Sequence, residues 1–181
     1  MKHRIVLIIL LLLSLPVFAG SAVFAPFYED SIPYCREIAN TAETYASASD
    51  AVIIPSLLDI PENTSTLYIV AHGNEYGILG ADDEPIGWSS IIISAVESGV
   101  STIIIDTCSS GSAIVIAQHL KIDLSFEIYT SASAGEPSRA EIGGTSLFSS
   151  LWCENGSDAI SPYDAFGTTV TPQYAVIDRR N

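Results

Sequence analysis

The segment Ser101–Ala113, which reads STIIIDTCSSGSA, decides the fold and points to a site. Thr102–Asp106 is apolar and β-branched on both faces, which is typical of a central parallel strand that is covered on both sides. Cys108 follows the strand, and small residues then lead into a helix predicted over Ala113–Leu120. A cysteine at the point where a buried strand opens into a turn is the first candidate for chemistry.

Strands and helices alternate along the rest of the chain. Further strands are expected at Ser21–Phe27, Ala51–Pro55, Leu67–Ala71, Phe126–Ser131 and Tyr174–Ile177, and helices at Pro33–Ala48, Trp88–Val96 and Leu147–Trp152. The strand at Ser21–Phe27 has the weakest pattern. This alternation predicts an α/β three-layer sandwich with a mostly parallel central sheet. The chain has 181 residues, 48% of them hydrophobic, so we expect residues 20–181 to form a single domain.

The first residues have the layout of a secretory signal peptide. Lys2 and Arg4 precede an apolar run, Ile5–Leu13, and small residues then lead to Ala19. The run is shorter than the roughly 20 residues of a membrane-spanning helix. Cleavage after Ala25 also fits the pattern, but it would place a proline directly behind the cut, which favours Ala19. We therefore expect residues 1–19 to be removed and the protein to be secreted or extracytoplasmic.

Charge and cysteine content restrict the partners and the redox state. Seven Lys and Arg residues stand against 21 Asp and Glu residues, and this balance disfavours binding to nucleic acid or to an anionic membrane. In a secreted protein, three cysteines suggest one disulfide and one free thiol. If Cys108 has a chemical role, Cys35 and Cys153 are the candidate pair. The alternative is that all three are reduced.

A histidine and a cysteine follow consecutive predicted strands. His72 and Gly73 come after Leu67–Ala71, and Cys108 comes after Thr102–Asp106. Adjacent parallel strands end at the same edge of a sheet, so the imidazole and the thiol are expected to lie side by side. Histidine can accept the thiol proton and later protonate a leaving amine, while the Gly73 and Cys108 amides can bind an oxyanion. One cysteine and one histidine do not make a zinc site, and we expect neither a metal nor another cofactor.

These two motifs resemble those of a known enzyme group. YIVAHG (68–73) and IIIDTCSSGS (103–112) are similar to the His-Gly and Asp/Glu-x-Cys-x-Ser-Gly motifs of the caspase-like (clan CD) cysteine peptidases. That group includes caspases, metacaspases, legumains, gingipains and clostripain. DTCSSGS looks closest to the metacaspase pattern, whereas EIYTSASAGEPS (127–138) is more similar to the legumain pattern.

The resemblance implies a caspase–haemoglobinase-like fold with His72 as general acid/base, Cys108 as nucleophile and Gly73 as an oxyanion donor. It also implies that Asp106, two residues before the cysteine, lines the primary specificity pocket. There its charge would suit an Arg or Lys side chain of the substrate. A pocket for a substrate Asn side chain remains a second possibility. The other reading of Asp106 is a strand-end acid that caps the next turn. By the same analogy Ser131 and Ser133 would form a pocket wall, and Glu136 would add a second acid.

The sequence therefore predicts a secreted cysteine endopeptidase, a thiol protease, that acts on a peptide or protein substrate. Two alternatives stay open. One is a non-catalytic caspase-like binding module, which the acidic composition and short chain favour. The other is a transpeptidase that uses the same thioester with an amine acceptor. The sequence carries no prediction of an oligomeric state.

Overall fold

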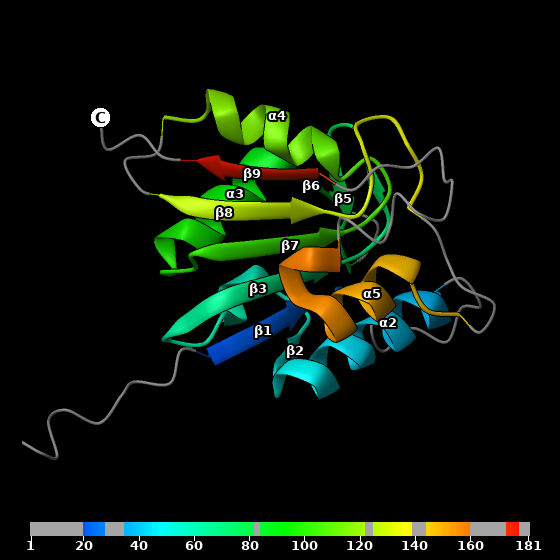
Figure 1. Ribbon diagram of the computed structural model, residues 1–181. Coiled ribbons are helices and arrows are strands. Elements are labelled where there is room, and N and C mark those ends of the chain that lie inside the picture. The colour runs from blue at the N-terminus through cyan, green and yellow to red at the C-terminus, as the bar shows by residue number, and fades with distance from the viewer. Residues whose placement is uncertain are drawn as a thin grey trace, which may run out of the picture.

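The computed structural model describes residues 20–27, 35–81, 84–121, 125–138, 144–159 and 173–177. Its central sheet has six strands in the order β2-β1-β3-β7-β8-β9. The strands are β1 (Gly20–Phe24), β2 (Val52–Ile54), β3 (Thr64–Val70), β7 (Thr102–Asp106), β8 (Phe126–Thr130) and β9 (Gln173–Ile177). All neighbours pair in parallel except β8 and β9. In Figure 1 the arrows of β1, β7 and β8 point one way and the arrow of β9 points the other.

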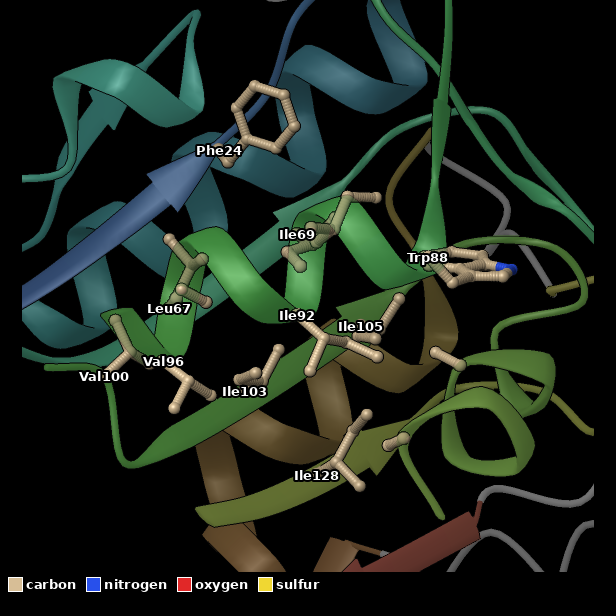
Figure 2. Close-up of a cluster of buried hydrophobic side chains, with 14 of the residues drawn as sticks. Phe24, Leu67, Ile69, Trp88, Ile92, Val96, Val100, Ile103, Ile105 and Ile128 are labelled. Carbon is tan, nitrogen blue, oxygen red and sulfur yellow. The ribbon is translucent and has the colours of Figure 1, made fainter. Parts of the chain in front are cut away.

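Side chains of the strands alternate between two buried layers, as a period of two dictates. On one face, Leu67, Ile103 and Ile128 pack against α3 (Trp88–Glu97) and α4 (Gly111–His119). This is the cluster drawn in Figure 2, where Ile92, Val96 and Trp88 of α3 lie over the sheet. On the other face, Val23, Tyr68 and Ile104 pack against α2 (Cys35–Ser49) and α5 (Leu147–Asn155). The predicted three-layer α/β sandwich with a mostly parallel sheet is confirmed.

β7 lies in the middle of the sheet, between β3 and β8. Ile103, Ile104 and Ile105 are completely buried, which agrees with a strand that is apolar on both faces. Since successive side chains alternate, Ile104 and Asp106 point toward the α2/α5 layer, and an acid therefore ends the strand inside a core. Two short 3₁₀ helices, η1 (Leu57–Asp59) and η3 (Gly156–Ala159), complete the described helical segments.

β1 is more important than its weak pattern suggests. It pairs with both β2 and β3, and Ala22 and Val23 are fully buried. Small residues give a weak strand signal, but they suit a strand that is covered by helices on both faces. A second, three-stranded sheet was not expected: β4 (Gly73–Asn74), β5 (Gly77–Leu79) and β6 (Pro85–Gly87). Its strands are too short to produce a periodic pattern.

The candidate Cys35–Cys153 disulfide is not formed, because both residues are free cysteines, and this prediction is corrected in favour of the alternative with three reduced cysteines. Cys35 is buried in the first turn of α2, whereas the Cys153 Sγ lies 3.8 Å from the carbonyl oxygen of Thr44. Thr44 is nine positions further along the same helix, a rise of about 13 Å. A disulfide needs Cα atoms within about 7 Å of each other, so the two thiols lie too far apart along α2 to be joined.

Residues 1–19, which carry the predicted signal peptide, lie outside the described residues. Within the segments that the structure does describe, no helix has the length and apolar character that crossing a membrane requires.

Candidate active site

His72 and Cys108 follow the paired strands β3 and β7 at the same level. Val70 and Asp106 are register partners at the ends of these strands, and each candidate residue comes two positions later. Both line one cavity of about 190 Å³ at the carboxyl edge of the sheet. Its lining residues are Glu37, Ile38, Thr41, Val70, Ala71, His72, Asp106, Thr107, Cys108, Ser138 and Ser146.

The loops that carry the two residues touch at Gly73. A Cβ atom at this position would lie 2.5 Å from Thr107 Oγ1 and 2.6 Å from the Cys108 carbonyl oxygen, closer than real Cβ contacts. Any residue other than glycine would therefore push the two loops apart. The glycine after the histidine keeps the two strand ends in contact, in addition to the oxyanion-binding role that the sequence predicts for its N–H.

The backbone around Cys108 is fixed by the segment that follows β8. Ser109 has a φ of 56°, in the left-handed region that non-glycine residues rarely adopt. Its N–H donates to the Glu136 carbonyl oxygen at 2.7 Å, and the Gly111 N–H donates to the Ala132 carbonyl oxygen at 2.8 Å. Ser110 Oγ donates to the same Ala132 oxygen and accepts from the Ala132 N–H. The turn after the cysteine is thus held by tertiary contacts.

His72 is held by the first described residues after β1 and by the small sheet. Its ring lies 6.2 Å from the ring of Phe27, centroid to centroid, and its Nε2 atom is buried. The Leu79 N–H donates to its carbonyl oxygen at 2.8 Å. The hairpin of β4 and β5 is closed by Asn74, whose side-chain oxygen accepts from two backbone N–H groups. The unexpected small sheet therefore positions the histidine.

Asp106 is a buried acid at the base of this cavity, with an exposed fraction of 5%. Tyr45 Oη donates to its Oδ2 and Ser138 Oγ to its Oδ1, each at 3.0 Å. Burial raises the pKa of the Asp106 carboxyl, while hydrogen bonds from hydroxyl groups act in the opposite direction. These two donors come from α2 and from the segment after β8, and not from the turn that follows β7, which the other interpretation of Asp106 as a cap would require.

Three of the predicted pocket residues lie elsewhere. Ser131, Ser133 and Glu136 are not among the described residues that line the cavity. Ser131 is fully buried, and its hydroxyl lies 3.1 Å from Ser138 Oγ, which in turn reaches Asp106. Glu136 contributes its backbone carbonyl to the Cys108 turn. Ser131 and Glu136 therefore support the site through hydrogen bonds without lining the cavity.

Sequence reasoning missed the contribution of α2 and of the start of α5. Glu37 and Thr41 are four positions apart on α2, so they share the helix face that lines the cavity. Ser146, the N-cap of α5, lines it as well. The hydroxyl of Tyr45 was missed as well, since the sequence spacing predicts a helix at this position but not where the hydroxyl lies. Among the described residues, no three His, Cys, Asp or Glu side chains gather as a metal site.

The similarity of this chain to known proteins is a similarity of fold. A scan against protein-family models finds no match, and a search of the curated proteins finds none either. Among solved structures, the crystal structure of caspase-1 from Spodoptera frugiperda is similar, with a TM-score of 0.52 and 13% sequence identity. The match covers 88% of this chain and 85% of that chain. The chain therefore has a caspase-like fold.

Proposed function

We propose that this protein is a cysteine endopeptidase in which Cys108 is the nucleophile and His72 the general acid/base. The Cys108 thiolate attacks the scissile carbonyl carbon, and the amides of Gly73 and Cys108 stabilise the resulting oxyanion. The His72 imidazolium then donates its proton to the leaving amine as the C–N bond breaks. Water hydrolyses the thioester and gives its proton to His72, which releases the acid product and restores the dyad.

The observation that carries this proposal is the register of β3 and β7. Val70 and Asp106 are paired, and His72 and Cys108 follow them at equal distance along the chain into one cavity. Two groups with complementary proton-transfer chemistry thus share one edge of a parallel sheet, where sites of α/β proteins form. The loop contact at Gly73 supports the same pairing.

The substrate residue before the cut is proposed to be basic, with arginine preferred. The cavity is lined by two carboxylates, Asp106 deep in the core and Glu37 nearer to solvent, and by no described Lys or Arg. A guanidinium has five N–H donors in a planar fork and can reach two carboxylates at once. A volume of about 190 Å³ suits one long side chain.

Export of the protein after cleavage at Ala19 is also proposed. β1 begins at Gly20 and pairs with β2 and β3, so a cut after Ala25 would delete a buried strand of the sheet. Sequencing the N-terminus of protein collected outside the producing cell is expected to give Gly20 as the first residue. A first residue of Pro26, or an intact N-terminus, would contradict this proposal.

Covalent labelling tests the nucleophile directly. A peptidyl-arginine chloromethyl ketone is expected to modify Cys108 before Cys35 or Cys153, because Cys35 is buried and burial raises the pKa of Cys153 to about 11. Mass spectrometry of the digested protein identifies the modified residue. The control is the matching reagent with citrulline, which lacks the charge. Equal labelling of Cys108 and Cys153 would contradict the proposal.

Turnover distinguishes the alternatives. A library of peptides that varies the residue before the cut is expected to show hydrolysis after arginine. Transfer of the acyl group to an added amine in place of water would indicate a transpeptidase. A properly folded protein that binds peptides but cleaves none would indicate a binding module.

A further inference from the structure

The Asp106 carboxylate is held by a phenol that reaches it from another layer of the fold. Tyr45 lies in α2, has no exposed surface, and places its Oη 3.0 Å from Asp106 Oδ2. Its ring stacks on that of Tyr68 in β3, with centroids 4.5 Å apart. Stacking fixes the ring, so the hydroxyl has a defined direction. Ser138 Oγ donates a hydrogen bond to the other carboxylate oxygen, Oδ1.

This arrangement addresses a physical problem of the site. A carboxylate removed from water tends to take up a proton. Burial is the largest of the influences on the pKa of Asp106, and it raises that pKa. No Lys or Arg lines the cavity among the described residues, so hydroxyl groups are the groups that favour the charged form. A hydrogen bond to a charged acceptor is stronger than one between neutral groups. The phenol of Tyr45 is one of these donors.

The titratable groups around Asp106 come from several elements. They are Tyr45 and Glu37 of α2, Tyr68 of β3, His72 and Cys108 in the loops after β3 and β7, and Cys153 of α5. Of these, Tyr45 donates a hydrogen bond to the carboxylate. Tyr68 accepts a bond from Ser49 at 2.9 Å. Tyr68 therefore provides a control that shares the environment of Tyr45 without the contact.

We propose that Tyr45 is a positioning residue that keeps the Asp106 carboxylate ionised and directed so that it can bind a cationic substrate side chain. The proposal rests on the proposed function for its biological meaning, but its physical content can be measured without turnover. If Tyr45 plays this part, removing its hydroxyl makes Asp106 take up a proton at a higher pH. Recognition of a cation then fails at a pH where the wild-type protein still binds.

The first measurement uses the protein without ligand. Nuclear magnetic resonance of the Asp106 side-chain carboxyl carbon is followed from pH 3 to pH 9 in the wild type, Tyr45→Phe and Tyr68→Phe. The titration midpoint of Asp106 is expected to rise by about one pH unit in Tyr45→Phe, as loss of a charge-assisted hydrogen bond predicts. It is expected to stay unchanged in Tyr68→Phe. An equal midpoint in the wild type and Tyr45→Phe overturns the proposal.

The second measurement concerns recognition. In a Cys108→Ala background, binding of an arginine peptide amide and of its citrulline counterpart is measured over the same pH range. The arginine preference is expected to disappear about one pH unit higher in Tyr45→Phe than in Tyr68→Phe, because it depends on the ionised carboxylate. Citrulline binding is expected to be the same in both. The proposal for Tyr45 is overturned if neither variant prefers arginine, or if both variants lose the preference at the same pH. Arginine-selective binding by a protein whose wild type shows no turnover overturns only the peptidase assignment.

Discussion

Replacing Cys108 by alanine is expected to remove peptide hydrolysis, by about 10⁴-fold or more in kcat, while the protein remains folded. Loss of a nucleophile removes the covalent route, and the dyad acts as a unit, so His72→Ala is expected to cost a similar factor. Cys108 is partly exposed at the end of β7, so its truncation leaves no large cavity in the core. Initial rates on the arginine peptide, with circular dichroism as a check of folding, provide the measurement.

Cys153→Ala is the matched control for this experiment. Cys153 is also a partly buried thiol, but it lies in α5 against the Thr44 carbonyl, and burial raises its pKa to about 11. At neutral pH it is therefore a protonated thiol with little nucleophilic character. Its variant is expected to keep wild-type activity. Full activity in Cys108→Ala would show that catalysis does not depend on this cysteine and would end the proposal.

Replacing Asp106 by asparagine is expected to reduce kcat/KM for the arginine peptide by about 100-fold, because the cation loses its deeply buried partner. The citrulline peptide is expected to change by less than about threefold, since a neutral group gains little from the charge. The ratio of the two kcat/KM values is the readout. A similar loss for both peptides would mean that the substitution disturbs the dyad and not the specificity pocket.

The same substitution is expected to raise stability at neutral pH. Burial raises the pKa of Asp106 above its unfolded value, so the folded state holds this proton more tightly than the unfolded state does. The contribution of Asp106 to stability is therefore greatest at low pH and falls as pH rises from about 4 through the folded pKa. Asparagine does not titrate, so the Asp106→Asn protein does not lose this stability as the pH rises. Thermal unfolding should show Asp106→Asn melting above the wild type at pH 7, with the difference shrinking as pH falls toward 4.

Asp59→Asn, which neutralises an exposed acid in η1, serves as the control for stability and is expected to leave the melting temperature unchanged at both pH values. A lower melting temperature for Asp106→Asn at pH 7 would mean that the hydroxyl groups more than offset the cost of burial. Together, the two readouts of Asp106→Asn test whether the protein gives up stability at this position in exchange for charge recognition.

The sequence predicts the central sheet well because most of its strands carry their own signal, although β1 carries a weak one. The run at Ile103–Ile105 indicates a strand covered on both sides, and the helix faces at Ile38 and Ile91 show the 3.6-residue spacing. The placement of His72 and Cys108 in one cavity follows from topology, because consecutive strands of an α/β unit are usually neighbours. These inferences need only local patterns and one general rule.

Other features depend on distances that no local pattern encodes. Tyr45 reads as a core aromatic, and only the crossing of α2 over β7 reveals that its hydroxyl meets Asp106. Glu37 lies one turn from Thr41, but its place in the cavity depends on how α2 is rotated. The Cys35–Cys153 pairing failed for a similar reason: the count of cysteines gives a pair but not its separation along α2.

Ser109 illustrates what this dependence means for reactivity. A serine in the left-handed region persists only where its surroundings impose that conformation, and the carbonyl of Glu136 is the partner that holds it. The shape of the chain next to the sulfur is therefore created by folding and is absent from the isolated sequence DTCSSGS. A synthetic peptide that copies this motif would carry the same thiol without its orientation, and would behave as an ordinary cysteine peptide.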